Sequence, residues 1–478
     1  MITGSEMAVV DENAAALGVP RVQLMESSGN AVAEVVDRVA DDGASVTVVG
    51  GRGNNGGDAF VAARFLDQYD LRVLLLGRPE TITTDIARQN WAALERAEYE
   101  TEQIRDASQF ELQDPDVVVD AMLGTGISGE LREPARTAAE AMNDGAATVV
   151  SVDVPSGMDA EDGTIAETAV DADEVVTFHD TKPGLADLDA GVTVADIGIP
   201  DAAETFVERG DLLRLGRDPS SHKGDSGEVL VIGGGPYTGA PALSAQAALR
   251  AGADLVRVAC PRAVARELQG YSENLIVRSF DGDHLAPLHV DGLLDLAADH
   301  DTVVFGPGLG DEAATLDAVA DFLEAYDGTA VVDADALQVV PDLDTDAELL
   351  CTPHQGELRA MGGETADDWR ERAELVTRFA AQLDQTILVK GVYDIVSDGE
   401  HTRVNRTGNA GMTVGGTGDV LAGITGALAA VQPLRHAAAV GAYTAGRAGD
   451  IVVEENGFGL VATDLLDAIP KALWTEND

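Results

Sequence analysis

Continuous apolar runs alternate with helical patterns along residues 45–199 of the chain. Five runs rich in valine and leucine predict strands, namely SVTVVG (45–50), LRVLLLG (71–77), DVVVDAM (116–122), TVVSVDVP (148–155) and DEVVTF (173–178). Between them, segments such as DAFVAARFLDQY (58–69) have the patterning of helices. Because strands that are apolar at every position are buried on both faces, the pattern predicts a parallel sheet covered by helices on both sides. Two more helices are expected before Asp42, the second opening at Pro20.

A second series of apolar runs follows the polar, turn-rich segment 214–227, RLGRDPSSHKGDSG, which we interpret as the linker leading into a second domain. The expected strands are EVLVIGG (228–234), LVRVAC (255–260), NLIVRSF (274–280), TVVFGPG (302–308), TAVVDAD (329–335), ELLCTP (348–353) and TILVKG (386–391). Residues 393–405 predict a hairpin that turns at Asp398-Gly399, and the remainder has helical patterning. The predicted fold class is therefore two α/β domains in tandem.

Composition supports a globular protein of more than one domain. The chain has 478 residues, of which 45% are hydrophobic. No apolar run reaches transmembrane length, and the first residues lack the pattern of a signal peptide, so we expect no membrane partner. Two cysteines, Cys260 and Cys351, exclude a disulfide framework and fit a reducing cytoplasm.

The net charge is −53, and the acidic residues are spread along the whole chain. Such acidity could serve a cationic partner, but its even distribution favours the hydrated surface of a protein from a very salty cytosol, where charges are screened. Nucleic acid binding would need a basic surface, and the sequence offers none.

Lysine is rare in this chain, and its positions are informative. Only Lys182, Lys223, Lys390 and Lys471 occur, and the first three stand beside glycine. A surface depleted of lysine is expected to keep it where a compact, mobile cation is needed. The alternative is that three remaining lysines fell beside glycine by chance.

Three loops of the first domain leave strand ends and carry polar residues. They are GGRGNNGGDAF (50–60), DAMLGTGISGELRE (120–133) and SVDVPSGMD (151–159). Open α/β sheets bind ligands at the carboxyl ends of their strands, so the loops predict a pocket that includes Asp120 and Asp153. The first loop is not a dinucleotide fingerprint, because Asp58 places negative charge where a pyrophosphate would lie. Each acid taken alone could instead be a cap or a surface residue.

The second domain has its own glycine-rich loops, GGGPYTGAP (233–241), FGPGLG (305–310), CTPHQGE (351–357), LVKG (388–391) and GGTGDVLAG (415–423). Glycines ahead of a helix let backbone N–H groups converge on an anion. An aspartate in such a loop would be repelled by a phosphate unless it has a function. We interpret Asp419 as a general base that deprotonates a hydroxyl attacking phosphorus. The alternative is a tight helix start capped by Asp419, and His354 could likewise be structural.

The motifs resemble those of NAD(P)H-hydrate repair enzymes. HKGDSGEVLVIGG, YTGAPALSAQAALRAGADLV, TPHQGE, LVKG and GGTGDVLAG are similar to the NAD(P)H-hydrate dehydratase domain, and GNNGGD, DAMLGTGISG and SVDVPSGMDA to the NAD(P)HX epimerase domain. Their order matches the bifunctional enzymes and covers nearly the whole chain. The resemblance implies a Rossmann-like three-layer epimerase domain at 1–213, the linker at 214–227, and a ribokinase-like α/β dehydratase domain at 228–478.

The resemblance also implies the chemistry. Water added across a double bond of the reduced nicotinamide ring gives R and S hydrates, which the epimerase interconverts. The dehydratase returns the S form to NAD(P)H and consumes ADP in bacterial and archaeal members, ATP in eukaryotic ones. The expected partners are hydrated NADH and NADPH and ADP, with K⁺ in the epimerase domain and Mg²⁺ in the dehydratase domain. We expect a homo-oligomer.

Residue roles follow by matching motifs. Asp120, Asp153 and Asp419 would be catalytic. In the first domain the hydrate would contact Asn54, Asn55, Gly56, Gly57, Asp58, Gly124, Thr125, Gly126, Ile127, Ser128, Gly129, Glu130 and Asp153. Potassium would be held by Asn55, Asp120 and Ser156. In the second domain the hydrate would contact Ala253, Gly308, His354 and Asp419, and the nucleotide Lys390, Gly391, Val392, Tyr393, Asp394 and Gly418.

Three positions depart from the family pattern. Ala59 and Asp254 stand where glycine is usual, and Gln355 stands where proline is usual. None removes a reacting group, but Ala59 could narrow the first pocket, and the three together put substrate affinity in doubt.

Two other classes of function stay open on sequence grounds. One is a ribokinase-like small-molecule kinase fused to an epimerase-like binding module, against which the intact epimerase motifs argue. The other is a non-enzymatic scaffold, since epimerase-like domains also occur as degenerate binding modules in RNA-decay assemblies. Retention of Asp120 and Asp153 and the lack of a basic surface count against it.

Overall fold

The computed structural model describes residues 1–126 and 129–474. The chain forms two compact units, Met1–Ala203 and a second unit from Glu204 onward. Among the described residues, no helix combines the length and the apolar character needed to span a membrane.

The first unit is built on one parallel sheet. Within its described residues the strand order is β3-β2-β1-β4-β5-β6-β7. The strands are β1 (Ser45–Gly50), β2 (Asp70–Leu76), β3 (Thr101–Ile104), β4 (Val117–Ala121), β5 (Thr148–Val152), β6 (Glu174–Phe178) and β7 (Gly191–Ala195). The helices are α1 (Gly4–Ala16), α2 (Arg21–Val39), α3 (Asn54–Arg64), α4 (Asp85–Arg96) and α5 (Ala135–Asp144).

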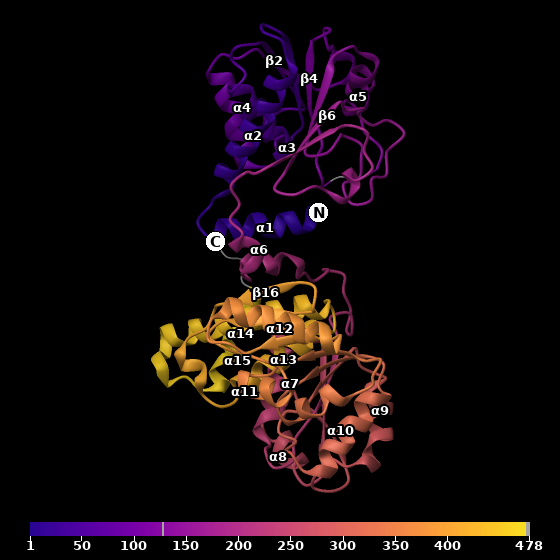
Figure 1. Ribbon diagram of the computed structural model, residues 1–478, viewed down its shortest axis with the longest axis vertical. Coiled ribbons are helices and arrows are strands. Elements are labelled where there is room, and N and C mark those ends of the chain that lie inside the picture. Colours follow the sequence, from indigo (N-terminus) through magenta and orange to yellow (C-terminus); the bar gives the residue numbers. More distant parts are fainter. Residues whose placement is uncertain (127–128, 475–478) are drawn as a thin grey trace. The chain divides into compact units, whose positions relative to one another are not determined.

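Both faces of this sheet are buried, which confirms the predicted Rossmann-like three-layer arrangement. Along β1, Val46 and Val48 belong to one apolar cluster and Val49 to another, because successive side chains point to opposite faces. The first cluster is covered by α1 to α4 and the second by α5. Figure 1 shows α2 and α4 on one side of the sheet and α5 on the other.

The second unit contains a larger, mostly parallel sheet. In the part that the structure describes, the order is β10-β9-β8-β11-β12-β13-β14-β15-β16, and only the pairs β14–β15 and β15–β16 are antiparallel. Its strands are β8 (Glu228–Ile232), β9 (Leu255–Pro261), β10 (Ile276–Phe280), β11 (Thr302–Phe305), β12 (Thr329–Val332), β13 (Glu348–Cys351), β14 (Thr386–Val389), β15 (Asp394–Ser397) and β16 (Thr402–Asn405). The predicted hairpin is therefore present, and Gly399 in its turn has a φ of 93°.

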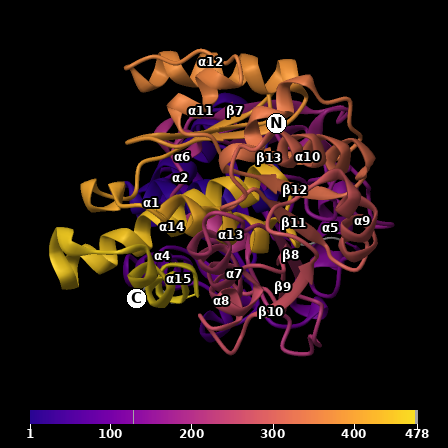
Figure 2. The same cartoon turned by 90° about the horizontal axis from the view of Figure 1, so that it is seen from below.

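Helices cover both faces of the second sheet. One face carries α7 (Gly239–Ala251), α13 (Thr417–Ala429), α14 (Leu434–Asn456) and α15 (Ala462–Trp474), and the other α9 (Val290–Ala297), α10 (Ala313–Ala325), α11 (Gln355–Ala360) and α12 (Trp369–Leu383). Figure 2 shows the strands between these groups, with α7 and α13 on one side and α9 and α10 on the other. Two short helices complete the chain, α6 (Ala202–Thr205) and α8 (Ala265–Gln269).

The boundary between the units corrects the prediction of residue 213. The division falls after Ala203, because the following segment pairs with the second sheet: the Val207 amide donates to the Val404 carbonyl at 2.9 Å. The Arg403 guanidinium also donates to the Asp211 carboxylate at 2.8 Å. The segment that looked like the end of the first domain is thus part of the second, and so is the predicted linker.

The net charge of −53 makes folding stability depend on salt. Like charges on a compact chain repel, and added ions screen them. We expect the melting temperature to rise by at least about 10 °C between dilute buffer and molar KCl. For a domain of this size, each 1 kcal/mol of added folding stability raises the melting temperature by roughly 2–4 °C, so relief of several kcal/mol of charge repulsion gives a rise of this size. A thermal scan in KCl, with a neutral solute of equal osmolality as the control, measures it, and an unchanged melting temperature would contradict the halophilic interpretation.

Candidate active sites

The three polar loops of the first unit meet at one edge of its sheet. They follow β1, β4 and β5, which are neighbouring parallel strands, so their carboxyl ends lie side by side. A cavity of about 680 Å³ opens there. It is lined by residues from all three loops, among them Asn54, Asn55, Asp58, Gly124, Thr125, Gly126 and Asp153.

Asp120 is the most deeply buried acid of this edge, with no exposed surface. Its carboxylate accepts hydrogen bonds from the Ser151 hydroxyl at 2.9 Å, from the Ser156 amide at 2.9 Å and hydroxyl at 2.6 Å, and from the Met122 amide at 3.2 Å. Burial raises the pKa of Asp120, and these hydrogen bonds oppose the rise. Asp120 therefore joins the loops after β4 and β5 and orients Ser156.

Asn55 lies beside this network, and the oxygen of its side-chain amide accepts no hydrogen bond. Its side-chain amide donates to the Leu123 carbonyl at 2.8 Å, while the buried Oδ1 atom has no hydrogen-bond partner. The Ser156 hydroxyl oxygen accepts from the Leu123 amide at 3.0 Å. A buried carbonyl oxygen without a partner is costly unless a ligand or ion completes it.

Asp153 is held in a strained backbone conformation, with a φ of 67°. Its carboxylate accepts from the Thr177 hydroxyl at 3.1 Å and lies 3.4 Å from the Nζ atom of Lys182. The side chain of Lys182 is only 1% exposed, so this rare lysine is not a surface residue. The expectation that lysine is kept where its charge is needed holds for Lys182.

Asp58 is buried in an environment that disfavours its charged form. Its pKa is raised well above the usual value by burial first and then by Asp153 and Asp11. The negative charge expected at this loop is therefore disfavoured by its surroundings. Asp11, on α1, lines the same cavity and was not among the predicted site residues.

The loop after β4 is only partly described. Ile127 and Ser128 lie outside the described residues. Gly124, Thr125 and Gly126 line the cavity, whereas Glu130 lines a neighbouring cavity and accepts a hydrogen bond from the Glu167 amide at 3.0 Å. Gly56, Gly57 and Gly129 do not line the first cavity, and the first two form the buried opening turn of α3. Ala59 packs in the apolar core and does not line the cavity. The expectation that its methyl group narrows the first pocket is therefore wrong.

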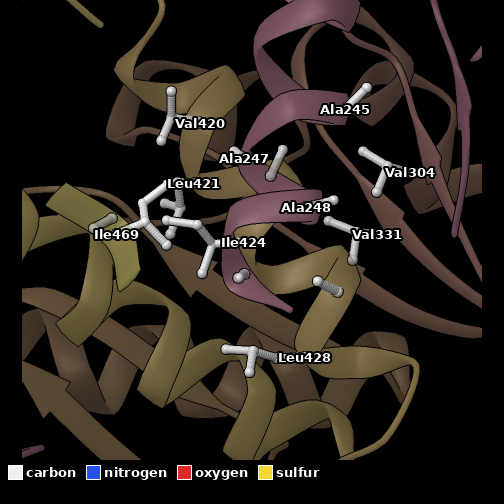
Figure 3. Close-up of a cluster of buried hydrophobic side chains, with 14 of the residues drawn as sticks. Ala245, Ala247, Ala248, Val304, Val331, Val420, Leu421, Ile424, Leu428 and Ile469 are labelled. Carbon is white, nitrogen blue, oxygen red and sulfur yellow. The ribbon is translucent and has the colours of Figure 1, made fainter. Parts of the chain in front are cut away.

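In the second unit, Asp419 lies in the first turn of α13. Gly416 precedes this turn with a φ of 97°, a conformation that favours glycine. Further along, a Cβ atom on Gly423 would lie 2.0 Å from the Ser244 carbonyl oxygen, so α13 and α7 pack with their backbones in close approach. The Ser244 hydroxyl also donates to the Asp419 main-chain carbonyl at 2.8 Å. Figure 3 shows apolar side chains of both helices in one buried cluster, among them Ala248 of α7 and Ile424 of α13.

Asp419 shares an electrostatic environment with Lys390 and Asp333. The pKa of Asp419 is raised to about 7, first by burial and then by the Asp333 carboxylate, while the Lys390 ammonium opposes the rise. Lys390 follows β14 and donates to Asp333 Oδ1 at 3.0 Å, and Glu357 lies 3.8 Å away. The Thr352 hydroxyl donates to the same Asp333 oxygen at 2.8 Å. Asp333 and Glu357 were not predicted, although both belong to strand-end motifs that were noted.

The turn after Lys390 contains the other predicted nucleotide residues. The Gly391 amide donates to the Asp394 carboxylate at 2.8 Å, and Asn405 donates to its other oxygen at 2.8 Å. Burial raises the pKa of Asp394 to about 6. Val392 is exposed, and Tyr393 stacks on Trp369 with ring centroids 5.5 Å apart. A Cβ atom on Gly418 would lie 3.5 Å from Lys390 Nζ, which places Gly418 beside this cation.

His354 and Gly308 lie at the same sheet edge, after β13 and β11. His354 caps α11: its Nδ1 accepts from the Glu357 amide at 2.9 Å, and its own amide donates to the Glu357 carboxylate at 2.7 Å. Its main chain pairs with Lys390. Gly308 has a φ of 74°, and a Cβ atom there would meet the Tyr237 carbonyl at 2.4 Å. Gln355 accepts from the Thr365 hydroxyl at 2.9 Å.

Ala253 was wrongly grouped with these residues. It follows the C-terminal end of α7 and precedes the first residue of β9, so it lies at the opposite edge of the sheet. The N-terminal end of α7 is the end that lies near Gly308. A Cβ atom added to Gly308 would be 3.3 Å from the Cβ atom of Ala240, in the first turn of α7. Asp254 anchors the loop before β8, accepting from the Gly224 amide at 2.9 Å and the Ser226 amide at 3.0 Å.

Comparison with known proteins matches a family to each of the two units. A family model for NAD(P)H-hydrate dehydratase matches residues 229–471, and one for the YjeF-related protein N-terminus matches residues 21–184. The second unit is also similar to a ribokinase-like superfamily protein of Enterococcus faecalis V583, with a TM-score of 0.50 and 24% identity over 56% of this chain and 95% of that one.

Two curated relatives extend over the whole length. The bifunctional NAD(P)H-hydrate repair enzyme Nnr of Methanothermobacter thermautotrophicus is 43% identical over 98% of this chain and 94% of its own. The protein of the same name from Archaeoglobus fulgidus is 41% identical over 99% and 98%. The chain belongs to the family of bifunctional NAD(P)H-hydrate repair enzymes. It joins an isomerase, the NAD(P)H-hydrate epimerase, to a lyase, the NAD(P)H-hydrate dehydratase.

Proposed function

We propose that the second domain dehydrates the S hydrate with Asp419 as the general base and ADP as the phosphoryl donor. Asp419 would take the proton of the hydrate hydroxyl as that oxygen attacks the terminal phosphorus of ADP. Phosphate would then leave while the neighbouring ring carbon releases a proton to water and the ring double bond forms, giving NAD(P)H, AMP and phosphate. The position of Asp419 between a helix start and the Lys390–Asp333 pair supports this role, because a general base works best with a pKa near the working pH.

Lys390, with Gly418 beside it, would hold the nucleotide phosphates, and the turn 391–394 the rest of the nucleotide. Among the described residues, no group of three or more His, Cys, Asp or Glu side chains could hold a metal ion. Mg²⁺ commonly keeps several waters and is bound by one or two carboxylates together with substrate phosphates. We therefore propose that Mg²⁺ arrives with the nucleotide.

For the first domain we propose that the cavity binds the R and S hydrates and that K⁺ binds at its floor. The buried, unpartnered Oδ1 of Asn55 fits a cation, and the Ser156 hydroxyl and Asp120 carboxylate supply hard oxygens of the kind such ions prefer. Bound K⁺ would supply positive charge beside the substrate. Asp120 and the protein hydrogen bonds to it would hold Ser156 in place.

Both activities can be tested in one mixture. The purified protein is given an R/S hydrate mixture, ADP and magnesium, and the recovery of dihydronicotinamide absorbance is followed together with inorganic phosphate. Recovery of the whole mixture with one phosphate per NAD(P)H supports both roles. A stable phosphorylated product without recovery would favour the kinase alternative, and recovery of only the S fraction would contradict epimerase activity.

The choice of ADP is a separate prediction. It rests on the membership of bacterial and archaeal relatives in the ADP-consuming group and on the salt-adapted composition. We expect faster recovery of NAD(P)H with ADP than with ATP, and AMP as the product. A side-by-side rate measurement at saturating hydrate decides it, and a clear preference for ATP would contradict it.

The number of subunits and the cellular location of the protein are further predictions. We expect a homo-oligomer in the cytoplasm, acting on hydrates of both NADH and NADPH. Light scattering in molar KCl measures the first of these.

A further inference from the structure

Four segments of the chain bring the carboxyl groups of Asp11, Asp58 and Asp153 and the ammonium group of Lys182 to the first-domain cavity, which is also lined by Asp85, paired with Arg88 at 2.6 Å. Asp11 lies on α1, Asp58 on α3, Asp153 after β5 and Lys182 after β6. Only Asp58 and Asp153 belong to motifs with a predicted role. The presence of Asp11 depends on the folding of α1 against the sheet, and no motif in the sequence marks it.

Lys182 lies beside one of these carboxyls, that of Asp153. Its Nζ atom donates to the Thr177 hydroxyl, the Phe178 carbonyl and the Asp180 carbonyl, each at 3.1 Å. These three acceptors account for the three ammonium protons. The contact between Lys182 Nζ and the Asp153 carboxylate at 3.4 Å is therefore an ion pair and not a further hydrogen bond. A buried ammonium needs a negative partner, and Asp153 is that partner.

The other two carboxyls differ in how readily they exchange a proton. Burial, Asp153 and Asp11 together raise the pKa of Asp58 well above its usual value. The pKa of Asp11 is raised to about 6, first by burial and also by Asp153, while Arg21, His179 and Lys182 oppose the rise. Asp11, which also lines the cavity, can therefore give and take a proton near neutral pH.

An epimerisation at the hydrated ring carbon needs such a pair. The carbon that bears the hydroxyl is also bonded to the ring nitrogen, so it can invert if the ring opens to an aldehyde and closes again. Opening requires a base for the hydroxyl proton and an acid for the ring nitrogen. We propose that Asp11 is this acid and that it works with Asp153 as the base, an inference that rests on the proposed epimerase function.

The step balances without another reactant. Asp153 takes the hydroxyl proton, the O–H electrons form the C=O bond, and the C–N bond breaks with its electrons passing to nitrogen. Asp11 gives nitrogen a proton. After the aldehyde rotates about its bond to the ring chain, nitrogen attacks the other carbonyl face, Asp11 recovers its proton and Asp153 returns the other one to oxygen.

The test compares Asp11→Asn with the wild type, starting from pure R hydrate and following both epimers by NMR after subtraction of the spontaneous rate. We expect the epimerisation rate to fall by about 10²–10⁴-fold. The melting transition of the first domain, compared with that of the wild type, is the control for folding, and dehydration of pure S hydrate by the same sample is the control for enzyme concentration. Glu12→Gln, which removes a neighbouring charge on α1 whose partner Arg21 lies 2.8 Å away, should epimerise at nearly the wild-type rate.

The pH profile separates an acid from a merely structural residue. Because Asp11 must carry a proton, kcat/KM of the wild type should fall as the pH rises through about 6, and Asp11→Asn should lack this limb. Asp11→Glu should recover part of the rate with a displaced limb, which keeps the test valid if Asp11→Asn does not fold. An unchanged limb in both variants, or wild-type epimerisation by Asp11→Asn, overturns the proposal. Failure of the wild type to epimerise would instead refute the underlying function.

Discussion

Asp419→Asn is expected to abolish nearly all dehydration while sparing epimerisation. Asparagine keeps the size and the hydrogen-bonding reach of Asp419 but cannot take a proton, and loss of a general base costs about 10²–10⁴-fold in rate. The affinity for ADP should change little, because Lys390 and the loop amides remain. The measurement is NAD(P)H recovery from pure S hydrate, with R/S exchange followed in the same sample.

The pH dependence sharpens this test. A base must be deprotonated to act, so kcat/KM of the wild type should rise with pH through about 7, and the variant should lack that rise. Asp464→Asn provides a matched control, because Asp464 also lies in the first turn of a helix and accepts a hydrogen bond from the Val461 amide at 2.9 Å. If Asp419 were only a helix cap, asparagine would replace it at little cost, and turnover would stay near the wild-type rate.

Asp120→Asn is expected to lower epimerisation by at least about 10- to 100-fold and to weaken its dependence on K⁺. The substitution removes a charge that orients Ser156 and would face the ion, while the side-chain volume stays the same. The initial rate of R/S exchange is measured over a K⁺ titration at constant ionic strength, balanced with tetramethylammonium chloride. Dehydration of pure S hydrate should stay close to the wild-type rate.

A structural role gives a different result. If Asp120 only ties the loops after β4 and β5 together, the variant should lower the melting temperature of the first domain and leave the half-saturating K⁺ concentration unchanged. Wild-type K⁺ dependence in a folded Asp120→Asn variant would contradict the ion site.

The interior strands could be predicted because burial on both faces leaves a continuous apolar run. The edge strands of the first sheet could not. In β3, TEQI, and in β7, GVTVA, much of the surface is exposed, and polar residues or glycine interrupt the apolar pattern. The domain boundary was misplaced for a related reason: only the tertiary pairing of Phe206 with Val404 shows that residues 206–214 belong to the second unit.

Candidate site residues could be predicted where glycine-rich loops or acidic residues follow the end of a strand. Glycine loops and strand-end acids identified Asp120, Asp153, Lys390 and Asp419. Asp11 was missed because α1 carries no motif and reaches the cavity only through packing. The reverse error, Ala253, arose because one continuous motif runs along the whole of α7, and nothing in it distinguishes the end at the ligand edge from the end at the far edge.

The burial of Lys182 has a practical consequence for labelling. Amine-reactive reagents can modify the exposed Lys223 and Lys471 in the native protein, whereas Lys182 has almost no accessible surface. Reaction at Lys182 requires the segment after β6 to open, and regions of a protein open with different free energies. Because the chain has so few lysines, each modified lysine can be assigned from the mass of the peptide that carries it. The rate of acylation at Lys182 would therefore measure how often this part of the first domain opens.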